Sequence, residues 1–396
     1  MGATSVMALG SFGLGFYGVA VYVAMLQQRH GWSASLVSAP VTAYYVAGAL
    51  LTVWIGDVYA RLGPRVVVAA GSTAMAAGVL ALGLVRDPWQ LYPSFLVMAL
   101  GWGAMSGAAI NIILAPWFER RRGLAVSLAF NGATLGGVIV VPLLITTIDA
   151  VGFTRALAAA VSVFLVVLVG LAVGVMRRGP EVFGLGPDGD PRRVSTATGC
   201  TPASGRWRAE ALSTWRFWSV SASFALALAA QVGVLTHLVA LVSPSLGAGG
   251  AGRAMSATTA AAVVGRLAMG VVVDRLDRRK VASATLVVQI GGLLLIASST
   301  GATPVYVGCA LFGLGVGNLT TLPGLILSVE WPPERFSALV GLVVGINQFT
   351  FAFGPALVGV IRDSTGAYGP ALGVCAGLQA TAALMIALGP GHRRDG

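Results

Sequence analysis

Charged residues are scarce in this sequence. Asp, Glu, Lys and Arg make up 10% of its 396 residues, hydrophobic residues make up 56%, and the mean hydropathy is +0.85. A soluble globular protein carries about 25% charged residues. The deficit of charge excludes an ordinary soluble domain and predicts an all-α integral membrane protein.

Other absences narrow the class further. The three cysteines show no Cys-x-x-Cys spacing, which argues against a disulfide framework or a metal site. There is no Gly-x-x-x-x-Gly-Lys-Ser/Thr loop for ATP and no spacing typical of a nucleophile with its base, so we expect neither an enzyme nor a cofactor. Acidic residues avoid the middle of the apolar runs, which disfavours a cation pump with a carboxylate relay.

Twelve apolar segments each approach the ~20 residues that a membrane-spanning helix needs. The first is too long for the apolar region of a signal peptide, roughly 7–15 residues, and we expect it to be a retained helix. The segments lie near 4–26, 34–55, 66–84, 92–114, 124–146, 154–176, 217–241, 254–272, 281–299, 304–328, 338–360 and 370–388.

Basic residues alternate between the two sides of these segments. With both termini in the cytoplasm, 19 of the 25 Lys and Arg residues lie in inner loops, the linker or the tail, and 5 lie in outer loops. This bias is the positive-inside pattern of an inner-membrane protein, and it explains the net charge of +11 better than nucleic-acid binding does.

The two halves of the chain repeat each other. Arg61 and Arg275 are 214 residues apart, as are Trp117 and Trp331, and both pairs follow apolar segments. We therefore predict two parallel six-helix pseudo-repeats, at 1–176 and 217–396, joined by a polar cytoplasmic linker at 177–216.

Arg266 is the one charged residue in the interior of an apolar segment, and a charge there costs at least about 2.5 kcal/mol. Its side chain could extend toward lipid headgroups, but the offset of 214 pairs it with uncharged Thr52, which favours a one-sided function. A guanidinium binds a carboxylate with two parallel hydrogen bonds. We predict that Arg266 faces a cavity and binds an anionic substrate.

Several polar residues are further candidates for substrate contacts, each with a structural alternative. His237 could carry a proton or be a satisfied buried histidine, and a cavity tyrosine could donate to substrate or simply pack. The amides must be hydrogen-bonded, to a ligand or to another helix. The remaining candidates are Tyr17, Tyr22, Asn111, Asn347 and Gln348.

The loops after the second and eighth segments contain acidic and basic residues next to helix ends. Such charges can latch neighbouring helices together, or they can serve only to set topology. The residues predicted to have this gating or structural role are Asp57, Arg61, Arg120, Asp274 and Arg275.

These motifs resemble the major facilitator superfamily, and within it the monocarboxylate transporter and oxalate/formate antiporter group. The resemblance spans nearly the whole chain. It is carried by Gly31-Trp32-Ser33, Gly56 to Arg65, Trp-Phe-Glu-Arg-Arg-Arg-Gly-Leu-Ala at 117–125, His-Leu-Val-Ala at 237–240, Gly-Arg-Leu-Ala-Met-Gly at 265–270 with Asp274-Arg275, and Gly-Pro-Ala-Leu-Val-Gly-Val-Ile-Arg-Asp at 354–363.

The resemblance implies the major facilitator fold and a carboxylate-binding arginine at Arg266. The sequence departs from the group in three places. Ala262 stands where some proton-coupled relatives have Asp, Asn347 and Gln348 stand where the dicarboxylate exchanger has a basic residue, and Ala60 stands where the superfamily loop has Asp. A single positive charge favours a monocarboxylate over oxalate.

We therefore expect a monomeric transporter whose halves rock by alternating access around a small organic anion such as lactate, pyruvate or formate. Coupling would be proton symport or anion antiport. The alternatives are an exporter of lipophilic drugs or metabolites in the same superfamily, and a non-transporting membrane receptor.

Overall fold

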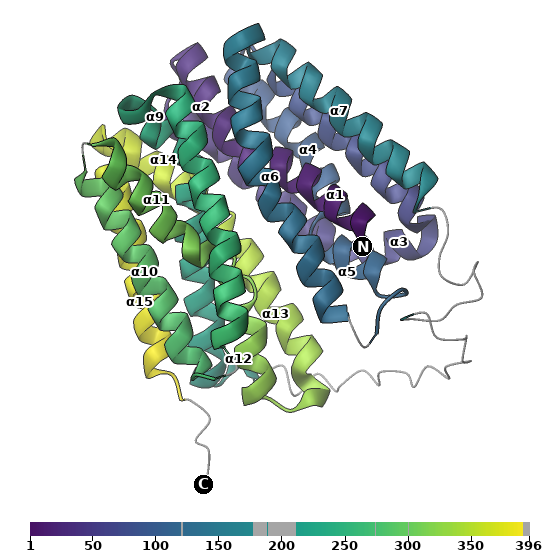
Figure 1. The fold of residues 1–396 in the computed structure, drawn as a ribbon, viewed down its shortest axis with the longest axis vertical. Helices are drawn as coiled ribbons and strands as arrows, with labels where there is room; N and C mark the ends of the chain where they lie inside the picture. The colour runs from purple at the N-terminus through teal and green to yellow at the C-terminus, as the bar shows by residue number, and fades with distance from the viewer. Residues whose placement is uncertain (120–121, 177–187, 189–210, 274, 300, 391–396) are drawn as a thin grey trace. The chain divides into compact units, whose positions relative to one another are not determined.

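The computed structural model describes residues 1–119, 122–176, 188, 211–273, 275–299 and 301–390. These residues form helices and no strands, which confirms the all-α prediction (Figure 1). The helices are α1 (Gly2–Phe12), η1 (Gly13–Tyr17, a π-helix), α2 (Gly18–His30), α3 (Ala34–Leu82), η2 (Pro88–Gln90, a 3₁₀ turn), α4 (Leu91–Met105), α5 (Gly107–Leu114), α6 (Arg122–Val151), α7 (Phe153–Gly174), α9 (Trp215–Val272), α10 (Arg278–Ser298), α11 (Ala302–Val316), α12 (Leu322–Glu330), α13 (Pro333–Phe351), α14 (Gly354–Thr365) and α15 (Gly369–Leu388).

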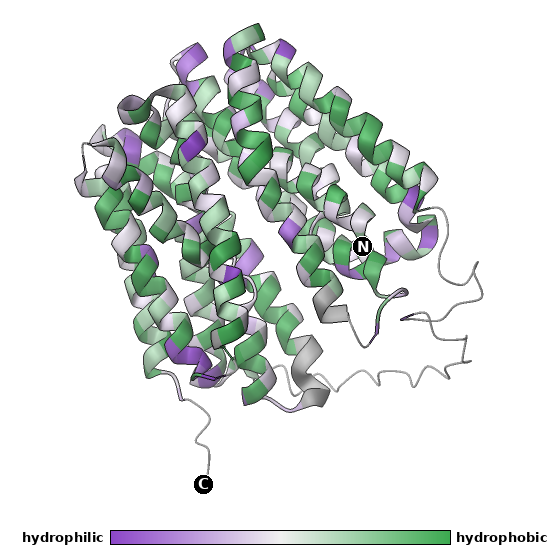
Figure 2. Cartoon of the chain, viewed as in Figure 1, coloured by the Kyte–Doolittle hydropathy of each residue, from purple (hydrophilic) through white to green (hydrophobic). Residues whose placement is uncertain are grey.

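In the described part of the chain, nine helical stretches are long and apolar enough to cross a membrane. Figure 2 shows hydrophobic residues along the helices and hydrophilic residues mainly toward helix ends. Large apolar side chains such as Val166 and Leu143 are exposed. Exposed apolar surface of this kind is suited to lipid.

Two of these stretches each contain two predicted segments, joined at a kink. Helix α3 runs through the loop expected at 56–65, and α9 runs through the loop expected at 242–253. Each is kinked at a glycine with positive φ, Gly63 (φ 73°) and Gly247 (φ 70°). Each kink lies within the connection expected between two predicted segments, and it joins two helices at a single residue that needs no side chain.

Two further segments are interrupted within the predicted span. Helices α4 and α5 are separated at Ser106, whose ψ of −174° is extended, and α11 and α12 are separated by a turn at 317–321. With the repeat offset of 214, Ser106 is equivalent to Thr320, which lies in that turn. The pseudo-repeats therefore share a break in backbone hydrogen bonding, which is tolerated at membrane depth only where other groups satisfy it.

By proximity the chain divides into two compact units. Unit 1 comprises Met1–Thr196, Leu238–Ser243 and Gly247–Ser256, and unit 2 comprises Ala197–His237, Pro244–Leu246 and Ala257–Gly396. Most of the predicted linker at 177–216 lies outside the described residues. The two-domain boundaries therefore stay a prediction.

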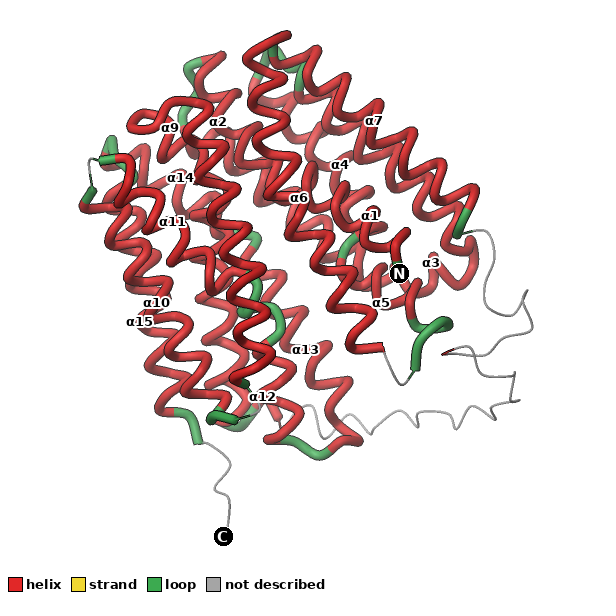
Figure 3. The backbone as a smooth tube through the Cα atoms, viewed as in Figure 1, coloured by secondary structure: helices red, strands yellow, loops and turns green. Residues whose placement is uncertain are grey.

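Within unit 1, the π-helix η1 leads into a group of aromatic side chains. The Tyr44 hydroxyl donates to the Gly15 carbonyl at 2.7 Å, and Trp102 packs edge-on against Phe12 and parallel to Phe16. In unit 2, α10 packs against α11 and α15, and the core includes buried Phe224, Leu286 and Ile326. Figure 3 traces these helices as continuous tubes joined by short turns.

The kink at Gly247 gives a stability prediction. An alanine at a positive-φ position costs about 1–3 kcal/mol, so Gly247→Ala should lower the unfolding temperature of the purified protein in detergent. Gly249→Ala is the matched control, since Gly249 has no positive φ and a Cβ there would meet only Arg253 Nη1, at 3.9 Å. Equal unfolding temperatures for the two variants would show that the Gly247 backbone is not constrained.

Candidate functional site

Arg266 lies in α9, where this helix crosses α11 at very close range. Gly265 packs directly against the backbone of Leu314, and a side chain at Gly265 would overlap it. The Asn318 side chain links the two helices, because its Nδ2 donates to the Gly265 carbonyl of α9 at 3.3 Å and to the Leu314 carbonyl of α11 at 3.1 Å. The small residue beside Arg266 thus brings the guanidinium to the end of α11.

The Arg266 guanidinium lies over Gly317, the residue that ends α11. A Cβ built on Gly317 would stand 2.9 Å from Nη2, 3.0 Å from Nε and 3.1 Å from Cζ of Arg266. The C-terminal end of a helix carries a partial negative charge, which stabilises a cation close to it. This arrangement explains in physical terms how a half-buried arginine is accommodated in an apolar helix.

Side chains satisfy carbonyls freed by the turn at 317–321. The Thr320 hydroxyl donates to the Gly317 carbonyl at 3.0 Å, and Asn318 Nδ2 donates to the Leu314 carbonyl at 3.1 Å. The end of α11 is therefore a fixed polar surface within an apolar bundle. The carbonyls there are acceptors, so they favour the Arg266 cation.

His237 is fully buried in α9 and both of its ring nitrogens have partners. Nε2 lies 3.0 Å from the Pro355 carbonyl, and Nδ1 lies 3.3 Å from the Tyr368 hydroxyl. Because a carbonyl only accepts, Nε2 carries the hydrogen and Tyr368 donates to Nδ1 in the neutral ring. Gly354 makes this approach possible, as its Cα packs against the backbone of Ala229.

The predicted residues of unit 1 are divided between buried and partly buried positions. Tyr22 is 0% exposed, and its hydroxyl has no hydrogen-bond partner in the described part of the chain; it lies against Gly18. Tyr17 is also buried, in η1, and packs edge-on against Phe16. Asn111 Nδ2 donates to the Gly107 carbonyl of its own helix at 2.9 Å. Of these three candidates, Tyr22 has the buried hydroxyl that a ligand could engage.

Asn347 and Gln348 lie on α13 of unit 2. Asn347 is 5% exposed, and its Oδ1 makes no hydrogen bond with the described residues, whereas Gln348 is partly exposed. The same helix borders a shallow groove lined by Gly341, Gly345 and Phe349. These amides are not brought to Arg266 by any contact that the described residues make.

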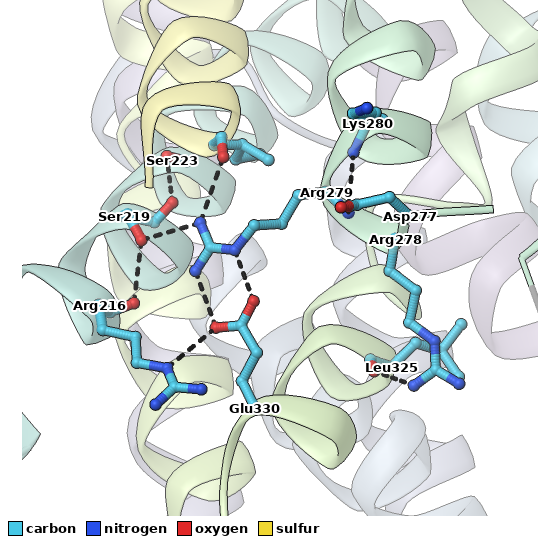
Figure 4. Close-up of polar contacts among 10 residues, drawn as sticks. Arg216, Ser219, Ser223, Asp277, Arg278, Arg279, Lys280, Leu325 and Glu330 are labelled. Atoms are coloured by element: carbon cyan, nitrogen blue, oxygen red, sulfur yellow. Dashed lines mark hydrogen bonds and ion pairs between the residues drawn. The ribbon is translucent and has the colours of Figure 1, made fainter. Parts of the chain in front are cut away.

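The strongest charge cluster in unit 2 lies around Glu330 at the end of α12 (Figure 4). Arg279 binds Glu330 bidentately, with Nε 2.5 Å from Oε1 and Nη2 2.8 Å from Oε2, and Arg216 Nε lies 3.5 Å from Oε2. The third nitrogen of Arg279, Nη1, donates to Ser219 Oγ at 3.0 Å and to the Ile386 carbonyl at 3.2 Å. Four helices, α9, α10, α12 and α15, are tied together at this point.

The predicted gating residues take no part in this cluster. Asp57, Arg61 and Arg275 are exposed. Arg120 and Asp274 lie outside the described residues. Their gating role stays a prediction.

The pairing of Arg279 with Glu330 is not predicted by the sequence pattern. Both residues were visible as charges at segment ends, but nothing in a linear spacing of 51 residues shows that they meet. The one available signal is that Glu330 is the acidic residue at the end of the tenth predicted segment, while the arginines after the eighth segment outnumber the acids beside them.

The fold and the apolar spans of the described chain are those of a multi-pass helical membrane protein. Residues 4–252 match the family model described as Major Facilitator Superfamily. The chain belongs to the major facilitator superfamily, as the sequence resemblance implied. Transport rather than an enzymatic reaction is the activity of this class.

Individual relatives are distant. The chain is 27% identical to MFS-type transporter 1 of an Ophiocordyceps species over 83% of this chain and 69% of that protein. It is 27% identical to monocarboxylate transporter 11 of Mus musculus over 93% of this chain and 80% of that protein. The crystal structure of the nucleoside transporter NupG superposes with a TM-score of 0.74 at 13% identity, covering 97% of this chain and 97% of that one, which shows a shared fold alone.

The buried ion pair gives a second stability prediction. Glu330→Ala would leave Arg279 buried without its carboxylate, which typically costs about 3–5 kcal/mol. We expect a clear fall in the unfolding temperature in detergent. Asp363→Ala is the control, because its pair with Arg362 is more exposed and such pairs are worth at most about 1 kcal/mol. A fall no larger for Glu330→Ala than for Asp363→Ala would contradict the tie among four helices.

Gly317 gives a prediction about Arg266. Gly317→Ala should push the guanidinium off the end of α11, and we expect weaker binding of any ligand that Arg266 holds. Gly324→Ala is the matched control in the next helix, since a Cβ at Gly324 meets nothing within 4 Å. The measurement is the thermal shift that small carboxylates cause in each purified variant. An unchanged shift in Gly317→Ala would show that the contact with Gly317 is unimportant.

Proposed function

We propose that this protein is a secondary active transporter of a small monocarboxylate, working by alternating access. The carboxylate is bound by Arg266, and lactate, pyruvate and formate are the substrates to test first. The observation that carries the proposal is a guanidinium in the middle of an apolar segment, held over Gly317 at the end of a broken helix.

The chemistry of this arrangement supports an anion with one carboxylate. A guanidinium stays charged at any working pH and offers parallel donors that match a carboxylate. Charged side chains within membrane-spanning segments commonly mark the path of a substrate or ion. The similarity to monocarboxylate transporter 11 over 93% of this chain favours the same substrate class.

The remaining features of the transporter follow as parts of the same proposal. The excess of Lys and Arg on one side favours cytoplasmic termini in the inner membrane. Of the other predicted site residues, Tyr22 stays a candidate for a substrate contact, because its buried hydroxyl has no partner among the described residues. Proton symport and anion antiport are told apart by whether a pH gradient alone, or only a second anion inside the vesicle, drives uptake.

Uptake of labelled lactate, pyruvate and formate into proteoliposomes tests the proposal. We expect Arg266→Ala to abolish uptake, because no charge remains for the carboxylate. Arg266→Lys should keep a small fraction, since an ammonium lacks the planar fork. Uptake equal to wild type in both variants, with the protein correctly folded, would overturn the role of Arg266.

A further inference from the structure

Three glutamines form a hydrogen-bonded chain through the interior of unit 2. Gln379 of α15 donates through Nε2 to Gln289 Oε1 at 3.0 Å, and Gln289 of α10 donates through Nε2 to Gln231 Oε1 at 3.0 Å. The three side chains are 0–2% exposed. These hydrogen-bonded side chains link three helices at positions where a leucine of similar size would also fill the space.

The chain of glutamines ends on the last turn of α11. Gln231 Nε2 donates to the Val316 carbonyl at 3.4 Å, and Gln289 Nε2 also donates to the Phe312 carbonyl at 3.1 Å. Gln289 reaches this turn because Gly315 has no side chain: a Cβ there would stand 2.6 Å from Gln289 Cδ. The glutamines therefore contact the turn directly before the helix breaks.

Val316 is the residue before Gly317, over which the Arg266 guanidinium lies. At a helix end in an apolar bundle, a carbonyl that lacks its helical partner needs another donor. Gln231 supplies that donor for Val316, as Thr320 does for Gly317. The position of Gly317 is therefore fixed on one side by a side-chain amide that belongs to another helix.

We propose that Gln231, Gln289 and Gln379 are positioning residues that hold the end of α11 beneath Arg266 and thereby set the affinity for the carboxylate. This inference rests on the proposed function for its consequence in transport. The claim that the glutamines hold the helix break is independent of the proposed function. The two claims have separate readouts.

Hydrogen–deuterium exchange on the purified full-length protein tests the first claim. Gln231→Leu should speed exchange of the amides at 314–322, while the rest of α11 and α12 stays protected. Ser283→Ala is the matched control, since it removes a hydrogen bond of 3.2 Å from α10 to the Ala383 carbonyl of α15 but does not touch the break. Unchanged exchange at 314–322 in Gln231→Leu would overturn the positioning role.

Uptake of labelled lactate, pyruvate and formate tests the second claim. We expect Gln231→Leu to raise KM about 3- to 20-fold, the factor associated with one interhelical hydrogen bond in a membrane, with little change in the maximal rate per folded molecule. A purely structural role would instead lower the amount of folded transporter and leave KM as in wild type. That second result would contradict the inference.

Two further variants separate the possible failures. Gln379→Leu removes only the glutamine farthest from the helix break, so it should change both the exchange and the KM less than Gln231→Leu does. It replaces Gln231→Leu as the test if that variant does not fold. Arg266→Ala is measured in parallel. If Arg266→Ala leaves KM unchanged, the proposed function fails together with the transport consequence, whereas the exchange data still decide whether the glutamines hold the helix break.

Discussion

A permanent positive charge inside an apolar helix is the constraint around which unit 2 is organised. Arg266 cannot lose its proton, so the surroundings must compensate the charge rather than remove it. The C-terminal end of α11 favours a cation beside it, and Gly317 leaves room for the guanidinium because it has no side chain. The helix break at 317–321 and the close crossing at Gly265 both lie beside this guanidinium.

The same constraint explains the difference between the pseudo-repeats. Both contain a broken helix at equivalent positions, Ser106 and the turn at 317–321. In unit 1 the counterpart of Arg266 is Thr52, whose hydroxyl donates to the Gly48 carbonyl of its own helix at 2.8 Å. In unit 1, aromatic side chains pack around the π-helix, whereas unit 2 contains the buried glutamine amides and the buried ion pair of Arg279 with Glu330. The common scaffold therefore has its charge chemistry on one side.

Much of the fold could be predicted because its signals are local. Apolar segments of about 20 residues, an offset of 214 between motifs and the single charge at Arg266 can all be found by inspecting the sequence. The missing parts depend on contacts across the fold. The pairing of Arg279 with Glu330 has no sequence period that marks it. Asn347 and Gln348 were predicted by segment position, and position alone does not show which face of a helix carries them.

The most direct test of the account is a cryo-electron microscopy structure of the protein with a saturating small monocarboxylate. The account predicts density for the carboxylate within hydrogen-bonding distance of the Arg266 guanidinium, which still lies over Gly317. Density for the acid at another place, or an Arg266 side chain that extends into lipid or headgroups, would contradict it.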